Sequence, residues 1–413
     1  MSLQSVPSRP SFLGVWFSLS SQSQRHLLVL FAAQGFSSGA ITVSTSLSSI
    51  IIFNITGAEA LAGLPSTINF FVSAVAAYWI GRLMQLYGRR SGLMLGYGMG
   101  ALGAVLAATM ALEKNLIGFL LGGAMLGAAN GAIAQAKYAA AELVDSHVRG
   151  TIIGALVTGS AFGSVLSWAT APLIYYYAKQ NQLPSIELGW YLGGFWLLLG
   201  FLLLAVAFFP KPISQISGFM QAAAVRTWKQ LWQVQAVRLA LLSMTLGQMV
   251  MTSLMVLMPL HAKHLGHEDS ATGLISVHIL GMFAFSWLTG RLVDLWGRAR
   301  AIRTGAGLLM FSAFVAVFAT RPLEMGFSLF VLGLGWNFCN VAGSTLLTDQ
   351  LEAHERPSIQ GAAELITWLA AAIGALGGGF IVGAFGFEVV SLVALLVGAL
   401  PLFGTWFLRT HQA

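Results

Sequence analysis

The segment GRLVDLWGRARAI at residues 290–302 has a near copy, GRLMQLYGRRSGL, at residues 81–93. Each copy follows a long apolar run and precedes another, so we interpret both as tight basic hairpins between membrane helices. Gly88 and Gly297 permit the reversal because glycine has no steric penalty at positive φ, and Gly81 and Gly290 allow a helix end to approach its neighbour closely. The copies lie 209 residues apart, about half of the chain, which indicates two homologous halves.

The composition indicates a polytopic membrane protein. Of the 413 residues, 57% are hydrophobic and 8% are charged, whereas roughly 25% are charged in a soluble domain. The mean hydropathy is +0.78, so the chain cannot cover itself with polar surface. The net charge of +7 lies mostly in short loops and does not indicate nucleic acid as a partner. A single cysteine, Cys339, excludes an intrachain disulfide.

Twelve apolar runs predict twelve membrane helices. Most reach the ~20 residues that a helix needs to cross a bilayer, and the runs are continuous rather than alternating, which disfavours a barrel of ~10-residue strands. The ninth run is short. The runs cover residues 26–53, 62–81, 91–112, 116–144, 151–178, 190–210, 240–265, 271–290, 304–319, 325–351, 359–386 and 389–408.

The hairpin pattern Gly-x-Leu-x-Asp-x-x-Gly-Arg, with Asp294 at its acidic position, resembles the loop signature of the major facilitator superfamily of transporters. The first copy has Gln85 in place of the aspartate. The resemblance covers nearly the whole chain and implies an all-α membrane protein with twelve transmembrane helices in two pseudo-symmetric six-helix bundles. A second repeat agrees with two halves, because HVRGTIIGA at 147–155 reappears as HERPSIQGA at 354–362.

The predicted organisation has five parts: a cytoplasmic tail at 1–25, a six-helix bundle at 26–210, a cytoplasmic linker with an interfacial helix at 211–239, a second bundle at 240–408 and a tail at 409–413. In the linker, Trp228, Leu231 and Trp232 share a helical face. Lysine and arginine set the orientation, since 16 of 21 lie on the side of the tails and linker. We therefore expect both termini to be cytoplasmic. We also expect a bacterial inner-membrane protein that is a monomer.

Cytoplasmic charges form a predicted gate. Each hairpin places arginines near a helix-end acid of its own half, and Glu142 followed seven residues later by Arg149-Gly150 is similar to the end of span 4 in the family's sugar porters. The alternative is a set of solvated charges worth ~0–1 kcal/mol per pair. The predicted gate comprises Gly81, Arg82, Gln85, Gly88, Arg89, Gly290, Arg291, Asp294, Gly297, Arg298, Glu142, Arg149, Asp349 and Arg356.

The two hairpins are expected to differ in strength. The resemblance implies that Asp294 contacts the start of span 5 near Thr151 when the cavity faces outward. Gln85 makes the corresponding contact at the start of span 11, but it brings no charge to the free amides of that helix. Asp294 is therefore the stronger predicted latch.

Polar residues in spans 1, 4, 7 and 10 are candidates for the substrate site, and methionines of span 7 would form an adaptable wall. The alternative is that they are interhelical hydrogen-bond partners. Because this predicted site contains few charges, it suits a neutral or lipophilic solute. The candidates are Gln34, Ser38, Asn130, Gln248, Thr252, Asn337 and Asn340.

Ionisable residues inside spans are costly and therefore need a reason. Glu364 and His278 are the candidates for proton coupling. The alternative for Glu364 is a buried partner of a cytoplasmic arginine, and the alternative for His278 is an interhelical hydrogen-bond donor. Lys137 either reaches the cytoplasmic boundary or pairs with Glu142. The weak metal candidate is His261, His264 and His267 in HAKHLGHED.

These features predict a secondary transporter, not an enzyme, that uses no cofactor. No phosphate-binding loop is readable, so ATP is not the expected driver. We expect efflux of a lipophilic or weakly polar compound, with protons as a coupling ion, by alternating access. Two marks of drug/proton antiporters are missing or degraded. Gly123 replaces the span-4 arginine, and the span-5 motif keeps Gly154 and Gly163 but has Ser167-Trp168 in place of Gly-Pro. Uptake of a neutral metabolite, divalent metal export and a non-transporting sensor or assembly factor are the alternatives.

Overall fold

The structure is a computed structural model that describes residues 19–56, 64–182, 185–210, 226–267 and 270–409. Helices account for the secondary structure of these residues, and no strand occurs among them. The first half contains α2 (Ser21–Thr56), α3 (Leu64–Leu112), α4 (Leu116–Ile133), α5 (Ala136–Ala141), the 3-10 turn η2 (Ser146–Val148), α6 (Arg149–Gln180) and α7 (Ser185–Ala207). The second half contains α9 (Trp228–Gln233), α10 (Gln235–His264), α11 (Ala271–Phe283), α12 (Ser286–Trp296), α13 (Arg298–Phe318), α14 (Pro322–Gln350), α15 (Arg356–Phe385) and α16 (Phe387–Arg409).

The described residues contain 11 segments long and apolar enough to cross a membrane. One of them, the 49-residue α3, contains two predicted spans joined at Gly88, where φ is 84° and ψ is 164°. The expected twelve crossings and the all-α fold are thereby confirmed. Spans 4 and 8 are each built from two helices, α4 with α5 and α11 with α12.

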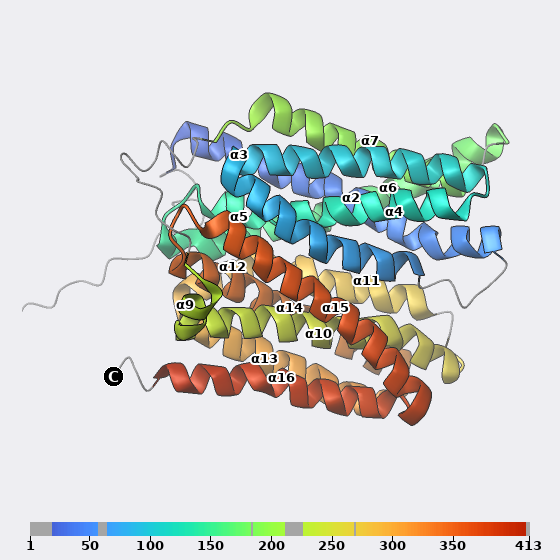
Figure 1. Cartoon of the computed structure of the whole chain (residues 1–413). Coiled ribbons are helices and arrows are strands. Elements are labelled where there is room, and N and C mark those ends of the chain that lie inside the picture. The colour runs from blue at the N-terminus through green and yellow to red at the C-terminus, as the bar shows by residue number, and fades with distance from the viewer. Residues whose placement is uncertain (1–18, 57–63, 183–184, 211–225, 268–269, 410–413) are drawn as a thin grey trace, which may run out of the picture.

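The helices run side by side, with α2 to α7 above α10 to α16 in the view of Figure 1. Helix α2 begins and α16 ends at the same end of the molecule. The turns at Gly88 and Gly297 and the segment between α14 and α15 also lie at this end, which we call the hairpin face. Two helix pairs join the halves, because α3 packs along α15 and α6 packs along α12.

Small residues set the close packing of the membrane helices. A Cβ on Gly103 of α3 would lie 2.7 Å from the Gly122 carbonyl oxygen of α4, and a Cβ on Gly122 would lie 2.5 Å from the Ala107 nitrogen. In a bilayer, helices associate through such van der Waals contact between small residues because lipid removes the hydrophobic driving force.

Two helix boundaries differ from the apolar runs. Helix α13 begins at Arg298 rather than near 304, and α10 begins at Gln235 rather than near 240. The added turns carry Arg300, Arg303 and Arg238, because a helix continues into the polar boundary where long basic side chains reach water. Hydropathy therefore underestimates these helices at their charged ends.

The helix in the linker is short. Helix α9 has six residues and starts with a capping box between Thr227 and Gln230. Leu231 is fully buried against α10, α14 and α15, whereas Trp228 and Trp232 are about half exposed. Leu231 therefore packs on the protein, whereas the two tryptophans are partly exposed at its surface. Residues 211–225 of the predicted linker and the tail at 1–18 lie outside the described residues.

Candidate functional site

Both hairpins turn at a glycine in the left-handed region. Gly88 has φ 84° and Gly297 has φ 87°, which confirms the role predicted for these glycines, since L-residues rarely adopt such values. Gly297 is followed at once by α13, so the reversal takes a single residue.

The other hairpin glycines pack on the opposite half. A Cβ on Gly290 would lie 2.1 Å from the Gly150 carbonyl oxygen, and one on Gly81 would lie 2.8 Å from the Gly361 Cα. In return, a Cβ on Gly154 would lie 2.9 Å from the Gly290 Cα. Gly154 and Gly361 occupy the same place in the second sequence repeat. The two repeats therefore meet each other across the halves, and any side chain would separate them.

Asp294 caps the start of α6 from the other half. Its Oδ2 accepts from the Thr151 backbone N–H at 2.6 Å and from the Thr151 hydroxyl at 2.7 Å, and its Oδ1 accepts from the Gly150 N–H at 3.1 Å. The contact predicted between Asp294 and the start of span 5 is confirmed. A carboxylate is favoured there by the partial positive charge of the helix N-terminus.

Gln85 makes a weaker contact at the matching place. Its side-chain amide donates to the His354 carbonyl oxygen at 3.0 Å, just before α15 begins. The prediction that Gln85 hydrogen-bonds free backbone amides of span 11 was wrong. Gln85 donates to a backbone carbonyl oxygen, whereas Asp294 accepts from backbone amides. An amide offers both a donor and an acceptor, and here the loop presents its carbonyl.

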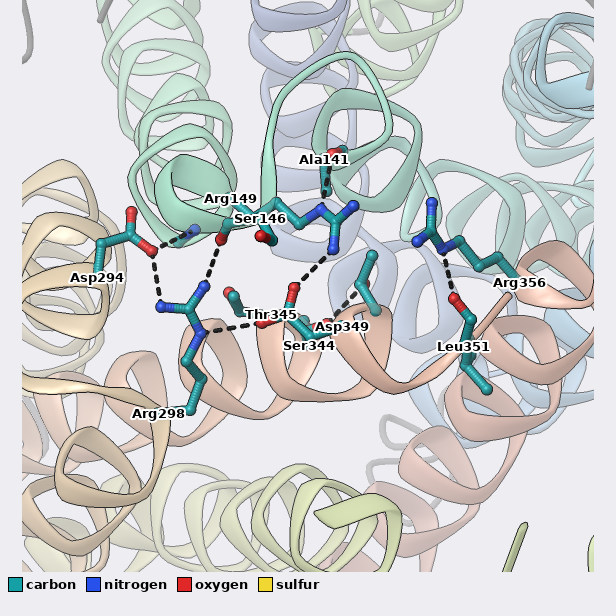
Figure 2. Close-up of polar contacts among 12 residues, drawn as sticks. Ala141, Ser146, Arg149, Asp294, Arg298, Ser344, Thr345, Asp349, Leu351 and Arg356 are labelled. Atoms are coloured by element: carbon teal, nitrogen blue, oxygen red, sulfur yellow. Dashed lines mark hydrogen bonds and ion pairs between the residues drawn. The ribbon is translucent and has the colours of Figure 1, made fainter. Parts of the chain in front are cut away.

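Arginines and acids complete the hairpin face. Arg89 binds Glu142 at 2.6 Å, and Arg298 binds Asp349 at 3.0 Å, each within its own half as predicted. Arg149 crosses the halves to bind Asp349 at 2.6 Å. Figure 2 shows Arg149 and Arg298 approaching Asp349 from opposite sides.

The symmetry of this network is incomplete. Arg356, the counterpart of Arg149, donates to the Leu351 carbonyl oxygen at 3.0 Å rather than to a carboxylate. Arg298 also donates to the Ser146 carbonyl oxygen at 2.5 Å, and Arg89 donates to Gln360 of the other half. Arg82 is exposed and lies 5.5 Å from the Tyr78 ring, and Arg291 is half-buried on α12.

A buried ion pair joins the halves inside the membrane region. Lys137 of α5 lies 2.9 Å from the Glu364 carboxylate of α15, and their side chains are 10% and 3% exposed. The Tyr138 hydroxyl donates to the same carboxylate at 2.9 Å, and Lys137 donates to the Asn340 side-chain oxygen at 3.0 Å. The suggested pair between Lys137 and Glu142 was wrong, because Glu142 binds Arg89.

Glu364 lies eight residues after the start of α15, about 12 Å along the helix. Removing one partner from a buried ion pair typically costs ~3–5 kcal/mol because the other charge stays desolvated. Replacing either Lys137 or Glu364 alone would therefore leave an unpaired charge buried between the two halves.

His278 occupies a different environment. It is fully buried between α11 and α14, and its Nδ1 lies 2.8 Å from the Leu329 carbonyl oxygen, within the second half. This placement matches the interhelical donor that was the alternative reading of His278. Of the two predicted coupling candidates, only Glu364 contacts the opposite half through contacts that the described residues show.

The polar candidates of the first half bind other helices of the same half. Gln34 donates to the Ser160 hydroxyl at 3.0 Å, and the Ser38 hydroxyl donates to the Ser160 carbonyl oxygen at 2.9 Å. Asn130 donates to the Asn69 side chain at 3.0 Å, and its buried Oδ1 has no hydrogen-bond partner among the described residues. These hydrogen bonds connect α2 to α6 and α4 to α3.

In the second half, Gln248 accepts from the Trp336 indole at 2.7 Å and donates to Thr252 at 3.3 Å. Asn337 donates to the Met282 carbonyl oxygen and to Ser286, and it is fully buried. Asn340 joins the ion pair described above. Of the seven predicted substrate residues, Asn340 alone is shown in a polar contact with the opposite half.

The outer histidines do not gather in the described residues. His261 lies 3.1 Å from the Ala319 carbonyl oxygen and stacks on Phe387 at 4.3 Å, while His264 is exposed. No group of three potential metal ligands occurs among the residues that the structure describes, including His267. Glu268 and Asp269 lie outside them.

The geometry shows contacts that the sequence reasoning missed. Tyr138 and Gln360 were not singled out, and Gln135 joins Arg89 to the Ala77 carbonyl oxygen. The polar side chains of span 4 near Lys137 could have indicated these contacts. Their partners in the other half could not be predicted, because no sequence pattern identifies them.

Twelve crossings in two related halves, closed on one face by a duplicated hairpin, define a membrane transporter of the two-bundle class. The sequence profile of the Major Facilitator Superfamily matches residues 27–302 and 240–413. The chain belongs to this superfamily, whose members are transporters rather than enzymes.

Individual relatives agree with this assignment. The chain is 29% identical over 411 residues to the uncharacterized MFS-type transporter YdeG of Bacillus subtilis, covering 97% of this chain and 94% of that protein. It is 24% identical over 392 residues to the riboflavin transporter RfnT of Brucella anthropi, covering 92% and 94%. The human organic anion transporter MFSD10 has a similar fold, with a TM-score of 0.78, 14% identity and coverage of 93% and 99%.

Proposed function

We propose that this protein is a secondary transporter that moves a small, neutral or weakly polar organic solute by alternating access. The observation that carries the proposal is the hairpin face, where Asp294, Arg149 and Gln85 each bind the opposite half through hydrogen bonds or ion pairs. These contacts are directional and reversible, so the halves can exchange them for water when they separate there. Opening of this face alternates with opening of the other.

Glu364 is the proposed coupling group, and Lys137 is its counter-ion. Ionised Glu364 holds Lys137 across the halves and thereby favours the closed hairpin face. A proton on Glu364 removes this attraction and leaves Lys137 with the Asn340 oxygen. Protonation therefore favours opening of the hairpin face, which is the step that a proton gradient would drive.

The solute class follows from the side chains available. Gln248 and Thr252 of α10 and Trp336 of α14 supply an amide, a hydroxyl and an indole, while Lys137 is already paired. Such groups suit a neutral heterocycle better than a phosphate or dicarboxylate. The similarity to a riboflavin transporter supports this class of solute. Export is our first direction, and uptake is the second.

A stability screen and a transport assay test the proposal together. Purified protein is screened with riboflavin, neutral sugars, organic acids, lipophilic drugs and Zn²⁺, since a ligand at a hundred times its Kd stabilises by ~2.7 kcal/mol. A compound that stabilises the protein is then followed in proteoliposomes with an imposed pH gradient. Specific binding of a partner protein together with no flux of any stabilising compound would contradict transport and support a sensor or assembly factor.

The coupling role is tested with Glu364→Gln, which keeps the shape of the side chain but removes its titration. We expect loss of uphill, pH-driven transport, while exchange down a solute gradient persists. His278→Gln is the comparison, because His278 contacts only its own half in the described contacts. If Glu364→Gln retains uphill transport, Glu364 is structural and the coupling proposal is wrong.

We further propose that the hairpin face is cytoplasmic and that the monomer contains the whole pathway. Lysine and arginine concentrate on this side, and α2 begins and α16 ends there. A reporter fused to the C-terminus should be active only in its cytoplasmic form. Activity of a periplasmic reporter at that end would reverse the orientation.

A further inference from the structure

An open hollow of about 490 Å³ lies beside the second hairpin, lined by Trp296, Arg300, Arg303 and Thr304. It forms where two consecutive helices part, because α12 packs on α6 and α14 while α13 packs on α14 and α16. The Trp296 indole is held parallel to the Phe338 ring at 6.3 Å. The hollow therefore joins two guanidinium groups and one indole at the end of two membrane spans.

Beyond the hollow, the same face of α13 carries exposed aromatic residues. Arg300, Arg303, Gly307, Phe311 and Phe314 follow one another at intervals of three or four residues, so they share one helical face. Phe311 and Phe314 are 48% and 51% exposed. A Cβ on Gly307 would meet nothing within 4 Å, so this glycine leaves an open gap between the basic and the aromatic parts.

We propose that this face of α13 binds one anionic phospholipid. The phosphate lies in the hollow between Arg300 and Arg303, and an acyl chain passes over Gly307 and along Phe311 and Phe314. Arginine suits phosphate because its planar fork gives two parallel hydrogen bonds. Tryptophan is typical of the headgroup level, and basic pockets at the ends of membrane helices bind acidic headgroups.

The length of the exposed face favours a lipid over a soluble anion. From Arg300 past Gly307 to Phe314 this face extends about 21 Å along the helix, a path that only a molecule with an acyl chain would use. The neighbouring Arg298 is directed to Asp294 and Asp349. The hollow is therefore distinct from the gate, although both belong to the same hairpin.

Native mass spectrometry of the full-length protein in detergent tests this site. The protein is titrated with phosphatidylglycerol or with phosphatidylcholine of the same acyl chains. We expect tighter binding of phosphatidylglycerol, and a loss of about fivefold in its affinity for each of Arg300→Gln and Arg303→Gln, the weight of one basic residue beside an anionic lipid. Arg25→Gln, which removes an exposed arginine at the start of α2, is the charge-matched control.

Gly307→Leu tests the proposed acyl-chain path without changing the charge. Leucine favours the helix more than glycine does, so the fold should persist, and the side chain fills the acyl-chain path. We expect weaker binding of phosphatidylglycerol, whereas Gly379→Leu, at another open position, should bind as wild type does. Equal binding of the two lipids by wild type overturns the proposal. It is also overturned if Gly307→Leu has no effect while orthophosphate displaces phosphatidylglycerol, because the site would then hold a soluble anion.

Discussion

At the scale of single residues, the two latches differ by one carboxylate. Asp294 accepts three hydrogen bonds at the start of α6, whereas Gln85 donates one to a loop carbonyl before α15. A carboxylate at a helix N-terminus contributes ~0.3–1 kcal/mol through the helix dipole, and more when partly buried. The closed hairpin face is therefore held more strongly on the side of Asp294.

Changing either side chain should weaken the closed face for a different reason. We expect Asp294→Asn to populate the open hairpin face, because the charge at the α6 start is lost. Gln85→Asp is expected to do the same on the side of α15, because a carboxylate cannot donate to the His354 carbonyl oxygen. A change of ~1.4 kcal/mol alters the ratio tenfold. Spin labels at Leu86 and Ala353, exposed residues on opposite halves, report the distance. Unchanged distances in active Asp294→Asn would refute the latch.

A second residue-scale contact fixes the end of the linker to the loop that Gln85 binds. Arg226 donates to the Glu355 carboxylate and, at 2.8 Å, to the Gln350 carbonyl oxygen. Burial opposes ionisation of Glu355, but hydrogen bonds from Arg226 and from the Glu352 amide hold the pKa of its carboxyl below the ordinary 4.5. The side-chain hydrogen bond to Glu355 in turn raises the pKa of Arg226.

The lowered pKa predicts a pH dependence of stability. Since the folded pKa of Glu355 lies below its unfolded value, its contribution is fully present above the unfolded pKa and is lost as pH falls through the folded pKa. At neutral pH, Glu355→Gln should cost about 1–3 kcal/mol, the usual cost of losing a charged hydrogen bond. Thermal unfolding from pH 7 to pH 3 should show this difference shrinking. If the difference in stability between wild type and Glu355→Gln stays constant from pH 7 to pH 3, the charge of Glu355 does not contribute to stability.

The sequence predicted some of these residues better than others. Gly88, Gly297 and Asp294 were predictable because each belongs to a short local pattern with one physical requirement. Lys137 was recognisable as an unusual charge, but its partner was not. Glu142 is nearby in the chain yet binds Arg89, whereas Glu364 reaches Lys137 from 227 residues away. Such a pairing depends on how two halves dock, which no local pattern encodes.

At the scale of elements, glycines decide how closely the halves can meet. Helix α6 crosses α12 where Gly150, Gly154 and Gly290 leave no room for a side chain. The matching crossing of α3 and α15 uses Gly81 and Gly361. The apolar runs predicted these helices. Only the two sequence repeats, the hairpins and the segments at 147–155 and 354–362, indicated which helix ends would be in contact.

Gly290→Ala should prevent the hairpin face from closing as it does here. The new Cβ would lie 2.1 Å from the Gly150 carbonyl oxygen, a backbone atom that cannot rotate away. Overpacking of this kind typically costs ~1–3 kcal/mol, and it acts on the closed state alone. Spin-label distances across the face should lengthen, and Gly379→Ala should leave them unchanged. A wild-type distance in Gly290→Ala would contradict this role of the glycine.

At the scale of the whole molecule, a duplicated sequence has produced a gate that is not symmetric. The hairpins share their glycines and arginines, but Gln85 lacks the charge of Asp294, and Arg356 binds a carbonyl where Arg149 binds Asp349. The first half therefore contributes the start of α6 and Arg149 to the strong side of the gate. We expect opening to begin at Gln85, where fewer contacts break.

A cleavable cross-link across the hairpin face tests alternating access most directly. Leu86→Cys and Ala353→Cys place thiols next to Gln85 and His354 and preserve their contact, while the native Cys339 is buried. After reaction with a reducible bismaleimide, the protein should still be stabilised by the solute found in the screen but should not transport it in proteoliposomes. Transport should return when the linker is cut, and each single-cysteine variant should remain active throughout. Transport at the wild-type rate by protein shown by mass spectrometry to be cross-linked would contradict the account.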